Sequence, residues 1–218
     1  LGVNVSDLSR ANTDKGERLS FQLVERGLPA KSLLPKLILN ALNALPIAKR
    51  MRWGSSRAEF VRPVHWIVLL LNGEVVDCDL MGVSASNISY GHRFHAPQPL
   101  TIDHPQNYAS LLADKGEVIA DFDQRKLAIS QQVSELASVL GGIAQIDEDL
   151  LNEVAALVEK PVALAGEFDR RFLAVPHEAL IYSMSEHQKY FHIVDGEGNL
   201  LPHFITVSNL SSRDPGQI

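Results

Sequence analysis

A cluster of cations beside a tryptophan is the part of the sequence best suited to binding chemistry. The run Lys49-Arg50-Met51-Arg52-Trp53-Gly54 combines three cations with one indole ring. Cations pair with phosphates, and an aromatic ring stacks on a nucleobase or a guanidinium group, so the run indicates nucleic-acid binding. In the alternative interpretation, Trp53 packs beneath a following strand near Val64, and the cations bind carbonyl groups at a helix end. The residues alone leave both interpretations open.

Two further segments have a similar character. They are Arg62-Pro63-Val64-His65-Trp66 and Gly91-His92-Arg93-Phe94, each with an arginine, a histidine and an aromatic residue. The segment His187-Gln188-Lys189-Tyr190-Phe191 offers a polar and aromatic surface, or equally a helix end that leads into a strand with its aromatic residues in the core.

The eight histidines raise the question of a metal site. Zinc-binding histidines on one helix usually stand four residues apart, whereas His177 and His187 are ten apart. His92 and His95 are three apart in a loop flanked by glycine and proline, and the spacing fixes no third ligand. The sequence also lacks a P-loop, a dinucleotide-binding glycine motif and a nucleophile elbow. It therefore nominates no catalytic residue and no metal ligand.

Composition places the chain among globular proteins. It has 218 residues, with 45% hydrophobic and 21% charged, which excludes collagen, coiled-coil rods and extensive disorder. The longest apolar run, Trp66 to Leu71, is far shorter than the roughly 20 residues that a membrane span needs. A single cysteine excludes an internal disulfide framework and suggests a reducing cytosol. Because the chain starts with Leu1 and shows no signal peptide, we expect a piece of a longer cytoplasmic protein.

Charge is distributed unevenly along the chain. The formal net charge is -6, yet residues 29–65 contain seven lysines and arginines against the single acid Glu59. Residues 96–159 contain eleven acids and three cations. A basic zone in an acidic protein attracts a polyanion such as nucleic acid. The alternative is a solvated surface, or ion pairs with the acidic half.

Hydrophobic periodicity and turn signals predict strands in separated pairs with helices between them, which favours an α+β fold over a doubly wound sheet. In the first half we expect a strand at Arg18–Val24, a helix from an N-cap at Ser32 to Pro46, and strands at Val64–Leu71 and Glu74–Met81 joined by an Asn72-Gly73 turn. In the second half we expect helices at 105–115, 123–140, 147–158 and 176–187, and strands at 162–168, 190–194 and 201–207.

Several motifs together resemble one family. They are the runs at 49–54, 60–66 and 91–94 together with Glu159-Lys160-Pro161-Val162-Ala163-Leu164, Pro176-His177-Glu178-Ala179-Leu180-Ile181, the segment 183–191 and Phe204-Ile205-Thr206-Val207-Ser208-Asn209. Their order and spacing resemble the β subunit of bacterial heterotetrameric glycyl-tRNA synthetase over almost the whole chain.

This resemblance implies a role in attaching glycine to tRNA(Gly). In that family the α subunit holds the ATP, magnesium and glycine site, and the β subunit recognises tRNA. The chain would then have two partners, tRNA(Gly) and the α subunit, no membrane, and no cofactor of its own. Given this role, the basic and aromatic residues identified above become the tRNA-binding candidates: Lys49, Arg50, Arg52, Trp53, Arg57, Arg62, Arg93 and Lys189.

The resemblance also implies a domain plan. Residues 1–28 would end a preceding region, residues 29–210 would form a domain like the B3/B4 module of the phenylalanyl-tRNA synthetase β chain, and residues 211–218 would begin a linker. Because the B3/B4 module edits mischarged tRNA, the alternative function is a hydrolase of the editing type or a metal-dependent hydrolase.

Overall fold

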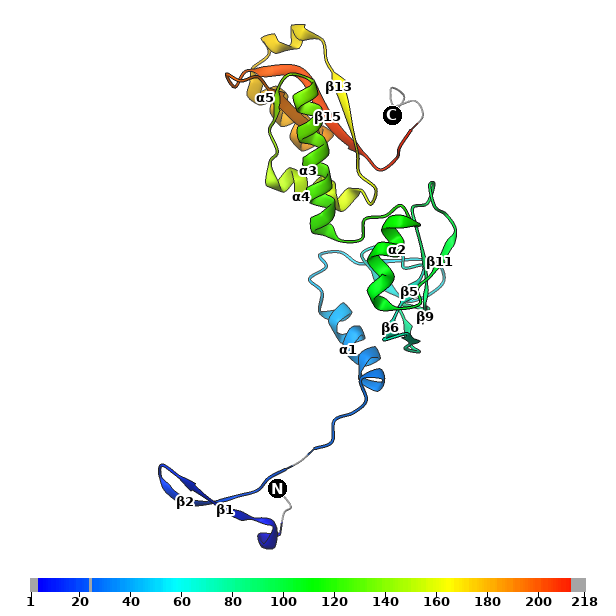
Figure 1. Cartoon of the computed structure of the whole chain (residues 1–218), viewed down its shortest axis with the longest axis vertical. Helices are drawn as coiled ribbons and strands as arrows, with labels where there is room; N and C mark the ends of the chain where they lie inside the picture. Colours follow the sequence, from blue (N-terminus) through cyan, green and yellow to red (C-terminus); the bar gives the residue numbers. More distant parts are fainter. Residues whose placement is uncertain (1–3, 24, 213–218) are drawn as a thin grey trace. The chain divides into compact units, whose positions relative to one another are not determined.

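The computed structural model describes residues 4–23 and 25–212. The chain divides into two units, Leu1–Pro46 and Ile47–Ile218. The first unit contains a short 3-10 turn, a two-stranded hairpin and one helix (Figure 1). These elements are η1 (Val5–Asp7), β1 (Ser9–Thr13), β2 (Gly16–Ser20) and α1 (Ala30–Ala44).

The hairpin of the first unit lies earlier in the chain than the sequence predicts. Strands β1 and β2 pair in antiparallel register from Ser9↔Ser20 to Thr13↔Gly16. Gly16 has a φ of 96°, a backbone conformation that glycine adopts without strain, so the turn sets the register. The strand predicted at Arg18–Val24 is therefore wrong in its limits, because β2 ends at Ser20; Val24 itself lies outside the described residues.

Helix α1 is confirmed, but its predicted N-cap is wrong. The helix begins at Ala30 after Pro29, and the hydroxyl of Ser32 donates to the carbonyl oxygen of Pro29 at 2.7 Å from inside the first turn. The helix ends at Ala44, before Pro46, because the residue ahead of a proline disfavours helical geometry. None of the described residues of α1 is buried; Leu34, Ile38 and Leu42 are half-buried, and Leu33, Leu37 and Leu39 are exposed.

The first half of the second unit is made of short strands and one helix. Their pairings give a β3–β4 ribbon, a β6–β7 hairpin, a β5-β9-β8 sheet and a β10–β11 pair. The elements are β3 (Met51–Arg52), β4 (Glu59–Phe60), β5 (Ile67–Val68), β6 (Leu70–Leu71), β7 (Glu74–Val75), β8 (Asp79–Leu80), β9 (Val83–Ser86), β10 (Ile88–Tyr90), β11 (Pro99–Thr101), η2 (Pro105–Asn107) and α2 (Tyr108–Asp114).

The Asn72-Gly73 turn is confirmed, but neither flanking strand is continuous. Strands β6 and β7 pair across the turn, and Asn72 has a φ of 57°. The predicted strand Val64–Leu71 instead splits, because β5 pairs in parallel with β9 while β6 pairs with β7. The predicted strand Glu74–Met81 also splits, because β8 turns back on β9 through Met81 and Gly82, both at positive φ. A Met-Gly turn lacks the Asn-Gly signal that marks such hairpins.

The second half of the unit is a four-stranded antiparallel sheet in the order β12-β14-β15-β13, with α3 packed along it and α4 beside α3 (Figure 1). The predicted helices and strands of this half are all confirmed, with boundaries that differ by a few residues. The elements are α3 (Phe122–Val139), β12 (Ile143–Ala144), α4 (Glu148–Leu157), β13 (Val162–Glu167), η3 (Arg170–Ala174), α5 (His177–Tyr182), η4 (Ser183–Gln188, a π-helix), β14 (Phe191–Val194) and β15 (Leu200–Ser208).

Local signals explain why these helices start and stop where they do. The carboxylates of Asp121 and Asp147 cap α3 and α4 by accepting from backbone N–H groups at 2.8 and 2.9 Å. Helix α3 ends at Val139, with Leu140 as its C-cap, and the next residue, Gly141, has a φ of 78°. Between the helices and the sheet lies the main core, which consists of Ile129, Val133, Ala137, Leu150, Leu151, Val154, Ala155, Val158, Phe191, Ile193 and Ile205.

The observed architecture confirms the α+β class, with β5–β9 as a parallel pair among antiparallel ones. The domain limits at 28/29 and 210/211 stay a prediction. Among the described residues, no helix is both long enough and apolar enough to cross a bilayer.

Candidate nucleic-acid interface

The β3–β4 ribbon carries the cationic cluster. Met51 pairs with Phe60 and Arg52 pairs with Glu59, and residues 53–58 form the connecting loop. Direct cross-strand pairing places the Arg52 guanidinium against the only acid of the basic zone, with Nε 2.6 Å from Oε1 of Glu59. Both side chains are exposed, so the pair adds little stability, but it partly neutralises Arg52.

Four other predicted cations remain available to an external anion. Lys49, Arg57, Arg62 and Arg93 are exposed, and within residues 4–23 and 25–212 none of their side chains has a hydrogen bond or an ion pair. Arg57 extends from the ribbon loop, Lys49 precedes the ribbon and Arg62 follows it. An unpaired guanidinium in water keeps its full charge for a phosphate partner.

The remaining predicted residues are less accessible. Arg50 and Trp53 are half-buried, and Arg50 interacts within the chain. Lys189 ends the π-helix in a left-handed conformation, with φ at 59°, and its Nζ lies 2.8 Å from Oε2 of Glu153 on α4. The hydrogen bond to Glu153 raises the pKa of the Lys189 ammonium group. Lys189 is therefore tied to α4 and stands apart from the four available cations.

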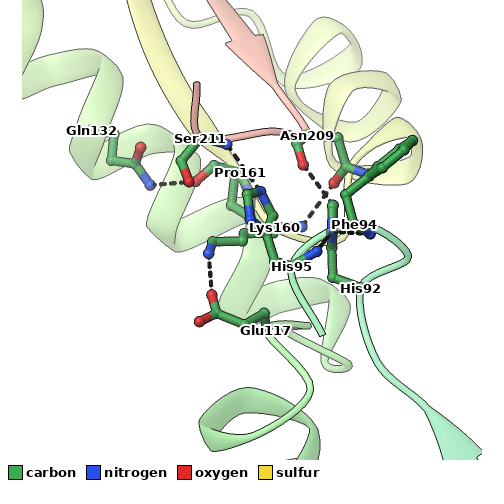
Figure 2. Close-up of polar contacts among 9 residues, drawn as sticks. All are labelled: His92, Phe94, His95, Glu117, Gln132, Lys160, Pro161, Asn209 and Ser211. Atoms are coloured by element: carbon green, nitrogen blue, oxygen red, sulfur yellow. Dashed lines mark hydrogen bonds and ion pairs between the residues drawn. The ribbon is translucent and has the colours of Figure 1, made fainter. Parts of the chain in front are cut away.

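A second polar centre, absent from the sequence predictions, forms around His92 (Figure 2). His92 is 1% exposed. Its Nδ1 lies 3.3 and 3.2 Å from the backbone nitrogens of Phe94 and His95, and its Nε2 lies 2.7 Å from the carbonyl oxygen of Asn209. Since Nδ1 accepts from two N–H groups, we assign the proton to Nε2, which donates to Asn209.

The His92–Asn209 junction, as we call His92, His95, Glu117, Lys160 and Asn209, joins four segments of the chain. Oδ1 of Asn209 accepts from the backbone N–H groups of Glu159 and Lys160 at 2.8 and 2.9 Å. The Lys160 ammonium pairs with Glu117, and this contact lowers the pKa of the Glu117 carboxyl. Nε2 of His95 accepts from the N–H of Ser211 at 3.3 Å.

Beside the junction, the Gln132 side chain on α3 hydrogen-bonds to two backbone groups at the start of β13. Its Nε2 donates to the carbonyl oxygen of Pro161 at 3.2 Å (Figure 2). Its Oε1 accepts from the N–H of Ala163 at 2.9 Å. The motif segments at 91–94, 159–164 and 204–209, which are far apart in sequence, thus meet in one hydrogen-bonded structure. In the sequence these segments indicated the family, but they did not indicate that they form a hydrogen-bonded junction.

His92 and His95, which were considered as metal ligands because they are three residues apart, do lie side by side, but their ring nitrogens make hydrogen bonds to the backbone. The ring centroids of His92 and His95 are 4.6 Å apart. Both nitrogens of His92 and Nε2 of His95 are taken by backbone groups. Among the described residues, no three histidine, cysteine, aspartate or glutamate side chains are grouped closely enough to hold a metal ion.

Comparison with known proteins gives a single family over the full length. The family model described as glycyl-tRNA synthetase beta subunit matches residues 1–218. The chain is 52% identical over 217 residues to the glycine–tRNA ligase beta subunit of Hahella chejuensis, covering 100% of this chain and 31% of the relative. It is 51% identical over 219 residues to that of Marinobacter nauticus, covering 100% and 32%.

The chain thus spans about a third of the length of the curated relatives that it matches. An identity of 52% over 217 residues, together with a family model that matches from the first residue to the last, is decisive. This chain belongs to the glycyl-tRNA synthetase beta subunit family.

Proposed function

We propose that this chain binds tRNA(Gly) through its exposed cations and acts as a scaffold in a glycine–tRNA ligase. In this proposal the ATP, magnesium and glycine chemistry takes place on a separate α subunit, and this chain holds no catalytic residue. The two relatives described above are named as beta subunits of a glycine–tRNA ligase, which supports the proposal. A cytosolic location is part of the same proposal.

The observation that carries the proposal is the set of available cations on and around the ribbon. Lys49, Arg57 and Arg62 lie within fourteen residues of one another and face no acid that pairs with them among the described residues. Each such cation that meets a phosphate releases a condensed counterion, so binding strengthens as salt is lowered. Contacts of this kind position a nucleic acid on the protein without reading its sequence.

The likeness to a B3/B4 module stays within the proposal, supported by the helix-backed antiparallel sheet. Likeness of fold does not establish an editing activity. The histidines closest to one another serve the junction, and no described feature favours the hydrolase alternative. We therefore propose one function and not two.

The test is a titration of the chain with tRNA(Gly) at a low and a high salt concentration, followed by fluorescence anisotropy. The double variant Arg57→Ala/Arg62→Ala is expected to weaken binding at low salt and to reduce the slope of log K against log salt by about 2, one for each lost phosphate contact. The matched control, Lys15→Ala/Arg170→Ala, removes the same charge from two exposed positions elsewhere and is expected to keep the slope. Equal slopes in both double variants, or no binding by the unaltered chain at low salt, would contradict the proposal.

A further inference from the structure

Two large aromatic rings from separate strands meet in the second unit and both remain partly exposed. Trp66 directly precedes β5, and Tyr90 ends β10. Strand β5 pairs in parallel with β9, and β10 follows β9 after one residue, so the pairing brings the two rings together. Their centroids are 4.9 Å apart with an interplanar angle of 58°. The Trp66 residue is 42% exposed and Tyr90 is 41% exposed.

The geometry of this pair determines where a ligand can sit. Rings 4.9 Å apart leave no space for a third ring between them, so a planar ligand would stack on an outer face of the pair. A cavity of about 410 Å³ lies against the rings. Ligand-binding clefts commonly measure about 300–1,000 Å³, so the volume suits one small ring system with its substituent. The cavity is lined by His65, Trp66, Tyr90, Gly91, Arg93 and Pro97.

The polar groups of this cavity suit an anion. Arg93 is exposed and its side chain has no hydrogen bond or ion pair to another described residue. His65 is exposed as well, and its ring centroid is 6.4 Å from that of Trp66. None of the six lining residues is acidic. Aromatic faces beside an unpaired guanidinium are the combination that holds a base by stacking and its phosphate by charge.

The buried junction holds the arginine in place. Arg93 follows His92. The imidazole of His92 is hydrogen-bonded to the carbonyl oxygen of Asn209, and the backbone N–H of His92 donates to the carbonyl oxygen of Gly116 at 2.6 Å. Gly91 packs so closely that a Cβ there would lie 2.4 Å from the same Gly116 oxygen. The backbone on the N-terminal side of Arg93 is thereby fixed, and a fixed backbone lowers the entropy lost when a ligand binds.

We propose that this cavity, the Trp66–Tyr90 pocket, binds one unstacked nucleotide of single-stranded RNA. The base stacks on the aromatic pair and its phosphate pairs with Arg93. Single-stranded RNA is favoured over a duplex because the base faces inside a duplex are already covered by neighbouring pairs. The inference rests on the proposed tRNA-binding function and adds to it a defined subsite, lined by residues other than Lys49, Arg57 and Arg62.

The experiment uses the intact 218-residue chain and a labelled single-stranded octamer of adenosine, with an RNA duplex of the same length as the second probe. Trp66→Ala is expected to weaken octamer binding by about 5- to 100-fold, the range for loss of one stacked base, and to leave duplex binding unchanged. Trp66→Phe keeps a stacking ring and is expected to retain most of the affinity. Arg93→Ala is expected to weaken binding and to flatten the salt slope by about 0.7, one single-strand contact.

A control and an optical signal keep the test independent of folding. Tyr182→Ala removes an aromatic residue that is 61% exposed outside the pocket, and it is expected to bind the octamer like the unaltered chain. The chain has two tryptophans, so in Trp53→Phe the remaining indole emission reports on Trp66 alone and is expected to be quenched by the octamer.

Unchanged Trp66 emission at saturating octamer, or equal octamer affinity in Trp66→Ala, Trp66→Phe and the unaltered chain, would overturn the inference. Quenching by an apolar peptide and not by RNA would assign the pocket to a protein partner and overturn it as well. If the pocket variants fail in this way while Arg57→Ala/Arg62→Ala still weakens tRNA(Gly) binding, the proposed function stands without the subsite. If the unaltered chain binds no tRNA at low salt, the proposed function itself fails.

Discussion

The imidazole Nε2 of His92 lies 2.7 Å from the carbonyl oxygen of Asn209, a residue 117 positions further along the chain. Both side chains also accept hydrogen bonds from backbone N–H groups. Nδ1 of His92 accepts from Phe94 and His95, and Oδ1 of Asn209 accepts from Glu159 and Lys160. One histidine and one asparagine thus link the two halves of the second unit by hydrogen bonds.

Replacing His92 by alanine is expected to destabilise the chain by about 3 kcal/mol or more. The variant removes three part-buried hydrogen bonds, each worth about 0.5–1.5 kcal/mol, and leaves a cavity in place of the buried imidazole. Urea denaturation measures the change. The control His177→Ala alters an exposed histidine and is expected to stay within about 0.5 kcal/mol of the unaltered chain. Equal losses in both variants would show that His92 is not a structural link.

Replacing Gly91 by alanine is expected to cost several times more stability than replacing Gly196. A Cβ at Gly91 would lie 2.4 Å from the Gly116 oxygen and 2.5 Å from its Cα, so two backbone segments must separate. We expect a loss of about 1–3 kcal/mol or more, together with weaker octamer binding at the adjoining pocket. A Cβ at Gly196 meets no atom within 4 Å, so Gly196→Ala serves as the matched control. Thermal unfolding of the two variants gives the comparison, and similar melting temperatures would refute it.

The ion pair between Glu117 and Lys160 predicts a pH-dependent contribution to stability. The hydrogen bond from Lys160 lowers the pKa of the Glu117 carboxyl below its ordinary value of 4.5. A carboxyl with a lowered folded-state pKa stabilises the fold above its ordinary pKa, and this contribution is lost as the pH falls through the folded-state pKa. The unaltered chain is therefore expected to be more stable than Glu117→Gln at pH 7, with the difference shrinking below pH 4.5.

Denaturation curves at pH 7, 5 and 3 measure that difference. Glu148→Gln is the matched control, because it removes the carboxylate of another exposed glutamate–lysine pair, Glu148 with Lys126, outside the junction. A constant difference between the unaltered chain and Glu117→Gln over this range would show that the carboxylate charge contributes nothing.

Replacing Glu59 by glutamine is expected to strengthen binding of tRNA(Gly). The substitution removes the carboxylate that holds Arg52 at 2.6 Å, so a further cation of the ribbon becomes available to phosphate. The affinity at low salt should rise, and the salt slope should steepen by about 1. Glu17→Gln releases Arg10 from a similar exposed pair in the first unit and is the matched control. A gain of the same size in both variants would reflect net charge alone and not the ribbon.

The sequence predicted the second half of the fold more accurately than the first. Helices α3 and α4 were predicted from their apolar periodicity, a signal that lies within the helix that it sets. The aspartates that cap them, Asp121 and Asp147, are equally local signals, although the only cap predicted was Ser32. The split of Val64–Leu71 was missed because its apolar run has two different partners, β9 and β7. A uniform apolar run carries no mark of where the partner changes.

For the candidate site, the sequence identified the cations but did not indicate which of them form ion pairs within the chain. It did not indicate that Arg52 is paired whereas Arg57 and Arg62 have no ion-pair partner among the described residues, because that distinction depends on cross-strand register. The pairing of Lys189 with Glu153 depends in turn on how the π-helix packs beside α4. Neither relationship follows from spacing along the chain.

By itself, the amino-acid sequence determined the α+β class, the Asn72-Gly73 turn, the positions of the helices in the second half and the family, because each depends on residues close together or on a pattern along the whole chain. Only the tertiary structure decided that His92 is a buried link to Asn209 and that Trp66 meets Tyr90 beside a cavity. The physical reason is that hydrogen bonds and stacking act over a few ångströms in space, and the fold alone brings residues so distant in sequence within that range.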